Sequence, residues 1–464
     1  MSQNLGKTLS MDGNSSFLRA LAKVASSKNL VKIQQALGTE AQLHLVGGVV
    51  RDSFLGIENV DIDLASKLAP DEAALKLKKS KIKVVETGLQ HGTLTIVLGD
   101  SNIELTTFRQ PAPHGVNNYS ESIETDLSGR DFTINAIAYS INNQTIIDPY
   151  NGLSDLSNKF LKAVNDPKQR FAEDPLRILR MIRFGPASNF ELDKKTEKAA
   201  ISLADKLKEI SPERIRDELF KILVLEHAST GLRFLRDHNL LEYTLPEMLP
   251  AVNCEQNKYH IHDVFEHTLW VIDRAPPEIV LRLAALFHDL GKPDTLSIGA
   301  DGERHFYKHE LNSGNIAKNT LARLHCSKKL IKEVKTIVRL HMRPLDCGPA
   351  GIRRIIKDTG EYYANWRKLK LADAPPTVPA DEYQKLVDEF DQKVAKELTR
   401  SIGSPFQNLM INGDDLIELG MQPGPKIGKI LKNLHEKVLE DPKLNTKTKL
   451  IELSKKALGQ TRQS

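Results

Sequence analysis

Two aspartates one residue apart constrain this chain more than any other feature. Asp61 and Asp63 stand near the end of the segment Leu45–Ser66, which reads LVGGVVRDSFLGIENVDIDLAS. Alternate side chains of a β-strand share a face, so Asp61 and Asp63 point the same way. Two neighbouring carboxylates repel unless a divalent cation neutralises them, and oxygen ligands that leave room for phosphates suit Mg²⁺. The pair predicts a two-metal site for phosphoryl or nucleotidyl transfer. An edge strand with solvated aspartates would give the same sequence pattern.

Other residues nearby favour the metal site. Gly47 and Gly48 precede Arg51, and glycines let a backbone approach a phosphate chain closely. Farther along, the run NIELTTFR carries an acidic residue, Glu104, among apolar and β-branched residues. We expect Glu104 to be a third carboxylate beside the metals.

The composition is that of an ordinary soluble protein, with 40% hydrophobic and 27% charged residues among 464. This length predicts more than one domain. No run is apolar enough to span a membrane and the N-terminus has no signal-peptide core, so we expect a cytoplasmic protein. Three scattered cysteines fit a reducing compartment, and a net charge of +5 is compatible with an RNA partner. The sequence predicts no protein partner.

The first part of the chain alternates between helical and strand patterns. Residues Phe17 to Leu37 have helical spacing, and the sequence predicts an N-terminal helical extension over 1–40. Residues 41–165 predict a compact α/β domain, because a helix after Pro70 interrupts five strand-like runs. Those runs are His44–Val46, Val60–Ala65, Ile82–Glu86, Thr93–Leu98 and Ile103–Phe108.

Two further motifs follow. The Pro- and Gly-rich stretch Gln110–Thr125 predicts a loop, and DLSGRDFTINAIAYSI then carries Arg130, Asp131 and Asn135. Arg130 suits a triphosphate, or it forms only a surface ion pair with Asp131. From Asp166 the pattern changes to amphipathic helices.

The segment EDPLRILRMIRF has a structural and a functional interpretation. Pro175 fits a first helical position, which makes Asp174 a natural N-cap. Alternatively, Asp174 and Arg177 lie three apart on one face and offer acceptors and forked donors to a base edge.

These motifs together resemble class II tRNA nucleotidyltransferases and bacterial poly(A) polymerases. GGVVRD…LG…DIDLA, RDFTINA, DPYNGLSDL, EDPLRILRMIRF and ERIRDEL occur here in the family's order, over roughly residues 45–225. The resemblance implies a nucleotidyltransferase head at 41–165 and a helical neck at 166–245 that binds the base and RNA. It implies addition of C, C and A to tRNA 3′ ends from CTP and ATP, with tRNA as partner.

The resemblance also implies roles for single residues. Asp61 and Asp63 hold Mg²⁺ with Glu104 beside them, one ion activating the 3′-hydroxyl and the other holding the triphosphate. Asp174 and Arg177 select C or A, while Glu173, Glu213 and Arg214 steady the neck. The residues that contact the nucleotide are Gly47, Gly48, Arg51, Arg130, Asp131, Asn135, Asp174, Arg177 and Arg180.

Two departures keep alternatives open. The family commonly has two arginines before the aspartate of RDFTINA, whereas Gly129 takes the first position here. The loop Gln110–Thr125 looks shorter than usual and contains no Lys or Arg. A poly(A) polymerase, or a partial enzyme that adds only CC or only A, are therefore the nearest alternatives.

A second set of candidate ligands lies beyond Pro250. Histidines at helix ends or on apolar faces, together with aspartates in apolar runs, suit a transition metal. The set is His267, His288, Asp289, His309, His341 and Asp373, with His288 and Asp289 adjacent in HDLGK.

This second set resembles the HD phosphohydrolase superfamily. The resemblance implies a domain at 246–375 in which His267, His288, Asp289 and Asp373 bind one divalent transition metal and His309 and His341 support a second. It implies hydrolysis of 2′,3′-cyclic or terminal phosphates on RNA, with Lys292 holding a phosphate. The helical tail, 376–464, ends in a basic run that favours contact with the tRNA backbone.

The predicted fold class is α+β, with a polymerase-β-like head followed by helical neck, body and tail. Two alternatives of other classes are an HD phosphohydrolase with an inactive head and a non-catalytic RNA-binding scaffold. The intact Asp61, Asp63 and Glu104 argue against both.

Overall fold

The computed structural model describes residues 15–57, 61–86, 92–99, 101–111, 118–257, 261–400 and 408–460. It divides into two compact units, Met1–Thr244 and Leu245–Ser464, which are described separately. One large sheet and many helices confirm the predicted α+β class. None of the helices within these described ranges has the length and apolar character needed to cross a membrane.

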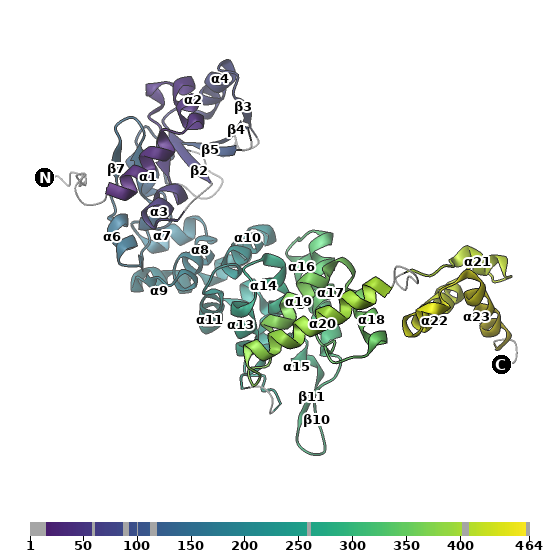
Figure 1. Cartoon of the computed structure of the whole chain (residues 1–464). Helices are drawn as coiled ribbons and strands as arrows, with labels where there is room; N and C mark the ends of the chain where they lie inside the picture. The colour runs from purple at the N-terminus through teal and green to yellow at the C-terminus, as the bar shows by residue number, and fades with distance from the viewer. Residues whose placement is uncertain are drawn as a thin grey trace. The chain divides into compact units, whose positions relative to one another are not determined.

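Unit 1 is built on a seven-stranded mixed sheet in the order β3-β4-β5-β2-β1-β6-β7 (Figure 1). The β2–β5 pair is parallel and the other neighbours are antiparallel. Its strands are β1 (His44–Val46), β2 (Ile62–Ser66), β3 (Lys83–Val85), β4 (Thr93–Leu98), β5 (Ser101–Thr107), β6 (Ala138–Ser140) and β7 (Thr145–Ile147).

The strand predictions agree closely with this sheet. His44–Val46 and Thr93–Leu98 were predicted to the residue, whereas Val60 lies outside the described residues. Leu45, Leu64 and Leu105 from three adjacent strands are almost completely buried. Burial of these apolar side chains fixes the register that places polar residues of β2 and β5 on one side.

Helices surround this sheet and continue into the neck. The helix α4 lies beside β3, and α2 packs against α4 (Figure 1). The predicted loop Gln110–Thr125 is only partly within the described residues, and its last residues begin helix α5 because Ser122 caps it. The helices of unit 1 longer than four residues are α1 (Ser15–Ala25), α2 (Lys28–Leu37), α3 (Gly48–Phe54), α4 (Pro70–Lys79), α5 (Ile123–Ser128), α6 (Gly152–Ser157), α7 (Pro167–Glu173), α8 (Arg177–Phe184), α9 (Lys194–Ser202), α10 (Pro212–Leu223) and α11 (Ala228–Asp237). The four-residue helix α12 (Leu241–Thr244) ends the unit, and the short strands β8 (Phe160–Leu161) and β9 (Glu191–Leu192) pair in parallel.

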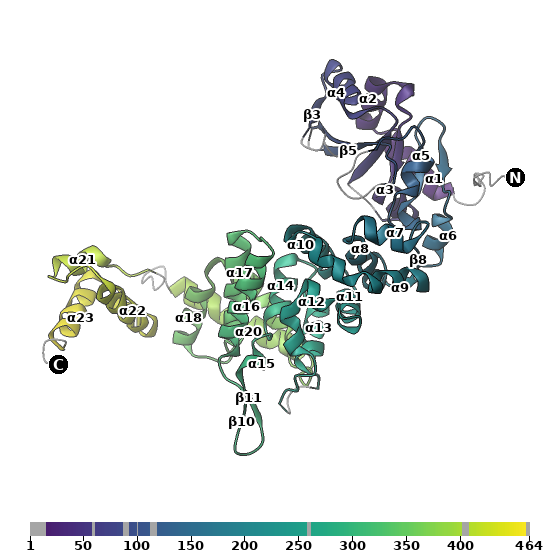
Figure 2. The same cartoon turned by 180° about the vertical axis from the view of Figure 1, so that it is seen from behind.

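Within the described residues, the regular structure of unit 2 is helical apart from one hairpin. Helices α14, α16 and α17 pack against one another (Figure 2), and Trp366 of α19 is fully buried. The hairpin strands β10 (Leu296–Ile298) and β11 (Arg304–Phe306) project from the helices. The helices are α13 (Val264–Arg274), α14 (Ile279–Phe287), α15 (Lys292–Thr295), α16 (His309–Arg323), α17 (Lys328–Leu340), α18 (Pro349–Thr359), α19 (Tyr363–Ala372), α20 (Ala380–Arg400), α21 (Gly413–Glu418), α22 (Pro425–Glu440) and α23 (Lys447–Gln460).

A buried arginine attaches the tail to the rest of unit 2. Arg353 of α18 donates to the Leu439 carbonyl at 2.6 Å and to the Glu440 carbonyl at 2.8 Å. It also donates to Glu397 of α20 at 2.7 Å. Because these carbonyls end α22, one guanidinium satisfies groups that a helix C-terminus leaves unpaired.

Candidate active sites

A cavity of about 320 Å³ in unit 1 is lined by all nine predicted nucleotide-binding residues. Its walls come from the β1–α3 connection, β2, the segment before β6 and the α7–α8 turn. The predicted residues that line it are Gly47, Gly48, Arg51, Asp63, Arg130, Asp131, Asn135, Asp174, Arg177, Arg180 and Arg214. Asp61, Glu104, Glu173 and Glu213 are not among its lining residues.

The predicted carboxylates meet because β2 and β5 are neighbours. Asp63 lies opposite Glu104 in the parallel register, and Asp61 directly precedes β2. Burial and the charges of Glu104 and Asp61 raise the pKa of Asp63, while Arg130 and Arg51 oppose this shift. A divalent cation would relieve the same repulsion, so the donor chemistry fits Mg²⁺.

Gly47 allows the backbone to pass close to this carboxylate. Its φ is +70°, which side chains of L-residues rarely adopt. A Cβ added there would lie 3.2 Å from Asp63 Oδ2 and 3.6 Å from Arg130 Nη1. The absence of a side chain keeps the space next to Asp63 open.

Asp131 organises a network of arginines on the other side of the cavity. Arg180 donates to Asp131 Oδ2 at 2.7 Å, and Asn135 donates to Oδ1 at 3.0 Å. Asn135 in turn accepts from Arg51 at 2.8 Å. Burial alone would raise the pKa of Asp131, but the charges of Arg180 and Arg177 and these hydrogen bonds hold it well below its usual range. Asp131 is therefore a permanent anion that orients cationic side chains.

Arg130 is paired in this structure with a residue that the sequence did not single out. It donates to Asp126 Oδ2 from Nε at 3.2 Å and from Nη2 at 2.9 Å. Asp126 also accepts the backbone N–H of Arg109 at 3.0 Å. Arg109 lines the cavity but was missed, although it ends the same NIELTTFR run that pointed to Glu104.

The two predicted base-reading residues are held by other side chains. Arg214 of α10 donates to Asp174 Oδ2 at 2.8 Å. Arg177 donates to Glu173 at 3.2 Å and to the Gly129 carbonyl at 2.9 Å. Pairs of this kind fix the direction in which each side chain faces the cavity.

The predicted N-cap role of Asp174 is wrong in detail. Helix α8 begins at Arg177 with Leu176 as its N-cap, because Pro175 and Leu176 form a turn after α7. Asp174 Oδ1 accepts the N–H of Leu176 at 3.2 Å within this turn. The carboxylate therefore stabilises the turn that directs Asp174 and Arg177 to the same cavity.

Unit 2 gathers its predicted ligands into two adjacent sets. Three donor atoms lie within 4.8 Å of one another in His267, His288 and Asp373, and likewise in Asp289, His309 and His341. Among the described residues, no comparable set forms around Asp63. The six ligands come from helices α13, α16 and the ends of α14, α17 and α19.

Asp289 connects the two sets. Its Oδ2 lies 3.3 Å from His288 Nε2, and its Oδ1 lies 3.2 Å from His309 Nε2. The prediction placed Asp289 with His267 and His288, and its Oδ2 also lies 3.5 Å from His267 Nε2. The structure adds that Asp289 faces His309 and His341 as well. Lys292, predicted to hold a phosphate, lies 2.6 Å from Asp289 Oδ2 and donates to Gln256 at 2.6 Å.

The ligand tautomers are fixed by the backbone. Nδ1 of His288, His309 and His341 lies 2.6–2.8 Å from a carbonyl oxygen of the preceding turn or strand. Each Nδ1 donates there, so Nε2 is the nitrogen that faces the neighbouring carboxylates and can bind a cation. Burial would lower the pKa of His288, but the charges of Asp289 and Asp373 raise it to about 10. The electrostatics and tautomers both suit cations between these ligands.

Three parts of the chain match models of known protein families. Residues 43–162 match the poly A polymerase head domain, which defines this part as a nucleotidyltransferase head. Residues 189–252 match the probable RNA and SrmB-binding site of polymerase A, and 309–453 match tRNA nucleotidyltransferase domain 2.

Relatives that align over most of the chain identify a narrower class of protein. The A-adding tRNA nucleotidyltransferase of Deinococcus radiodurans is 30% identical over 84% of this chain and 90% of its own length. The CCA-adding enzyme of Ligilactobacillus salivarius is 31% identical over 92% and 95%. This chain belongs to the tRNA nucleotidyltransferase family. The Bacillus stearothermophilus CCA-adding enzyme, solved with CTP, has the same fold, with a TM-score of 0.69 and 24% identity over 94% of this chain and 98% of that one.

Proposed function

We propose that unit 1 adds C, C and A to the 3′ end of tRNA from CTP and ATP without a nucleic-acid template. The observation that carries this proposal is one cavity lined by Asp63, by arginines and by the Asp174–Arg177 pair. A carboxylate that suits Mg²⁺, cations that suit a triphosphate and side chains that suit a base edge together match a nucleoside triphosphate.

The residues divide the work by their chemistry. Arg51, Arg130 and Arg180 bind the triphosphate, and Arg109 adds a further positive charge beside Gly129. Asp174 accepts from a base edge and Arg177 donates to it, so protein side chains replace a template strand. Mg²⁺ at Asp61 and Asp63, with Glu104 beside them, supplies charge stabilisation for the attacking hydroxyl and the departing pyrophosphate. Asp131 and Asn135 orient Arg180 and Arg51.

The extent of addition separates this proposal from its alternatives. The relatives named above include an A-adding and a CCA-adding protein. Addition of C and A by one cavity is favoured because Asp174 and Arg177 present both an acceptor and donors. Addition of CC alone, addition of A alone and poly(A) synthesis are the competing outcomes.

The test is nucleotide addition to tRNA by the full-length chain with CTP, ATP and Mg²⁺. Asp61→Ala and Asp63→Ala are expected to abolish addition, whereas Glu191→Gln, an exposed substitution in β9 of the same unit, retains it. Full activity in either aspartate variant would overturn the proposed site.

We propose as a second function that unit 2 hydrolyses phosphate esters at RNA ends. The observation that favours it is the pair of ligand sets joined by Asp289. All of the candidate ligands except His288 line a cavity of about 350 Å³ that also contains Lys292 and Lys370, which suit a phosphate. Divalent transition metals bound there supply Lewis-acid activation of water.

Hydrolysis of 2′,3′-cyclic AMP after loading with Mn²⁺ or Ni²⁺ tests the second function. Asp289→Asn and Asp373→Asn are expected to abolish hydrolysis without affecting nucleotide addition. Hydrolysis that survives both substitutions would overturn the assignment.

The basic tail is proposed to contact the tRNA backbone. Lys447 and Lys456 of α23 keep 62% and 68% of their side chains exposed although each forms one ion pair. Charge contacts of this kind make affinity fall with salt. Replacing Lys449, Lys455 and Lys456 by Gln is expected to weaken tRNA binding and reduce its salt dependence.

A further inference from the structure

The hairpin of unit 2 is joined directly to the candidate metal centre. Strand β11 ends at Phe306, and His309, which begins α16, follows after two intervening residues. The Phe306 carbonyl accepts from His309 Nδ1 at 2.8 Å, so the end of the hairpin orients one of the ligands. Whatever occupies this part of the cavity therefore lies next to the ligand sets.

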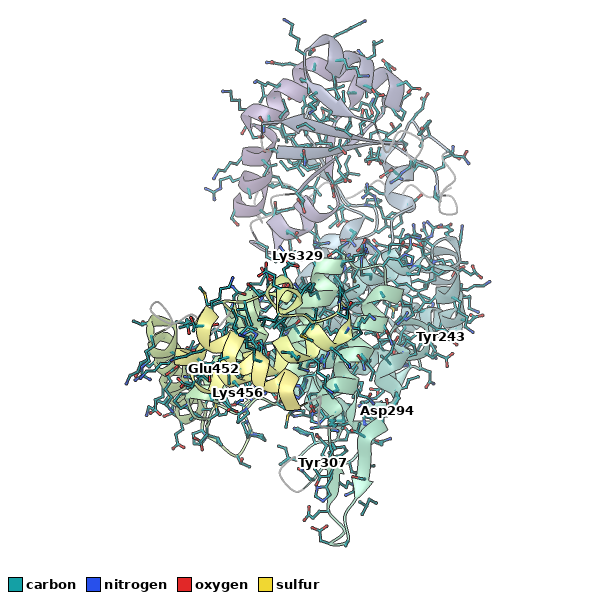
Figure 3. The ribbon with its side chains drawn as sticks, turned by 90° about the vertical axis from the view of Figure 1, so that its right-hand side faces the viewer. Tyr243, Asp294, Tyr307, Lys329, Glu452 and Lys456 are labelled. Atoms are coloured by element: carbon teal, nitrogen blue, oxygen red, sulfur yellow. The ribbon has the colours of Figure 1, made fainter. Side chains whose placement is uncertain are left out.

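Two aromatic rings of the hairpin segment form the cavity rim. The rings of His305 and Tyr307 stack with centroids 5.3 Å apart and planes 13° from parallel, and both residues line the cavity. Tyr307 is nevertheless 71% exposed. Figure 3 shows Tyr307 beside the hairpin, at the surface of unit 2. A parallel pair with an exposed outer ring is a ready platform for a third flat ring.

Charged and apolar groups both line this cavity. Basic side chains of Lys292, Arg304 and Lys370 accompany the ligand sets. The remaining wall includes Met342, Pro375 and Pro376, which are apolar. A cavity of about 350 Å³ is far larger than one phosphate needs, and it has the size of a small-ligand site.

We propose that Tyr307 is a base-stacking residue of this cavity and holds the base of a nucleotide whose phosphate is directed to the ligand sets. The proposal rests on the proposed phosphohydrolase function and adds to it the residue that positions the base of the substrate. Stacking on a π-face accepts any base, so the cavity takes RNA 3′ ends without sequence preference.

Binding to the Mn²⁺-loaded full-length chain tests this proposal independently of hydrolysis. The probes are 3′-AMP, inorganic phosphate and a short RNA ending in a 3′-phosphate, measured by calorimetry. Tyr307→Ala is expected to weaken 3′-AMP and RNA binding about 5-fold or more, because one stacked base contributes that much, and to leave phosphate binding unchanged. Any nucleotide that binds to unit 1 adds the same binding signal for the unaltered chain and for every variant.

Two further variants serve as controls. Tyr307→Trp keeps the ring and is expected to retain affinity. Ile298→Ala removes a 70% exposed side chain from the same hairpin that is not among the cavity's lining residues, and is expected to change nothing. An unchanged affinity for 3′-AMP in Tyr307→Ala, or an equal loss for 3′-AMP and phosphate, would overturn the base platform.

Hydrolysis measured in parallel separates the two proposals. Tyr307-dependent binding without any hydrolysis would overturn the phosphohydrolase function and leave the nucleotide site standing. If 2′,3′-cyclic AMP is hydrolysed but Tyr307→Ala changes neither the binding affinity nor the rate, the base platform alone would be overturned. Binding to RNA but not to 3′-AMP, or the reverse, identifies which form of the nucleotide the cavity accepts.

Discussion

Arg214 holds the carboxylate of Asp174 through a hydrogen bond of 2.8 Å between residues 40 positions apart. Arg214 lies in the first turn of α10, and Asp174 lies in the turn between α7 and α8. Both side chains line the unit 1 cavity. The neck helix therefore fixes the acceptor that we propose reads the base.

Removing this contact is expected to reduce base selectivity. Arg214→Gln leaves Asp174 without its charged partner, and hydrogen bonds to charged groups contribute about 1.5–3 kcal/mol. We expect the preference for CTP and ATP over UTP and GTP to fall about tenfold or more, measured as a ratio of kcat/KM values. Arg216→Gln is the matched control, since Arg216 pairs with neighbouring Asp217 on the same helix and does not line the cavity. Unchanged selectivity in Arg214→Gln would contradict the role given to this contact.

A comparison of alanine variants at Gly47 and Gly56 separates the effect of backbone strain from the effect of blocking the site. Gly47→Ala and Gly56→Ala each place a side chain at a φ near +70°, which is expected to lower the free energy of unfolding by about 1–2 kcal/mol. Only the Gly47 variant puts a methyl group next to Asp63, because nothing lies within 4 Å of a Cβ at Gly56. We expect nucleotide addition to fall about tenfold or more in Gly47→Ala alone. An equal loss of rate in both variants would assign the effect to strain.

The ionised Asp63 carboxylate is expected to lower the stability of the metal-free fold, although it contributes to metal binding. Burial, Glu104 and Asp61 raise its pKa in the folded state above the ordinary value. Its ionisation therefore opposes folding above that folded pKa, and the penalty disappears as the pH falls below the ordinary value near 4. Asp63→Asn should raise the melting temperature at neutral pH in EDTA while abolishing addition.

Two comparisons check the cause of this stabilisation. Mg²⁺ should raise the melting temperature of the unaltered chain more than that of Asp63→Asn, because only the former binds the cation well. Glu191→Gln, at an exposed site in unit 1, should leave the melting temperature unchanged. A lower melting temperature for Asp63→Asn at neutral pH would show that the carboxylate stabilises the fold instead.

Asp289 is expected to control the metal content of unit 2. Its two oxygens face different ligand sets, so Asp289→Asn should reduce the number of bound transition-metal ions from two per chain to fewer than one. Mass spectrometry of the dialysed protein measures this number. Asp294→Asn, an exposed neighbour seen in Figure 3, should keep both ions. Loss of nucleotide addition in Asp289→Asn would contradict the independence of the two sites.

Local patterns in the sequence predicted most elements of the head. Alternation located β1 and β4 to the residue, because the buried leucines of these strands leave little freedom in register. Which strands pair with each other was harder to predict from the sequence than where each strand lies. Asp63 and Glu104 become partners only because β2 and β5 pair in parallel across 41 residues of chain. Capping at Asp174 was misjudged because Pro175 and Leu176 form a turn before α8, so Asp174 Oδ1 accepts the N–H of Leu176 within that turn instead of capping the helix.

The ligands of unit 2 were predictable one by one, whereas their grouping was not. Adjacent His288 and Asp289 pointed to a metal, but the division into two sets depends on how α13, α14, α16, α17 and α19 pack. Arg109 ends the NIELTTFR run, but neither Arg109 nor Tyr307 could be assigned to a cavity from the sequence, because their places there follow from where β5 and β11 end.

The length of the product made on tRNA tests the central proposal most directly. Three tRNAs, ending at the discriminator base, at C and at CC, are each incubated with the full-length chain, CTP, ATP and Mg²⁺, and the products are resolved to one nucleotide. We predict that all three converge on the same CCA end and grow no further. Extension of the CC-ending tRNA alone, a stop after the second C, or a long A tract would contradict addition of C, C and A by this one cavity.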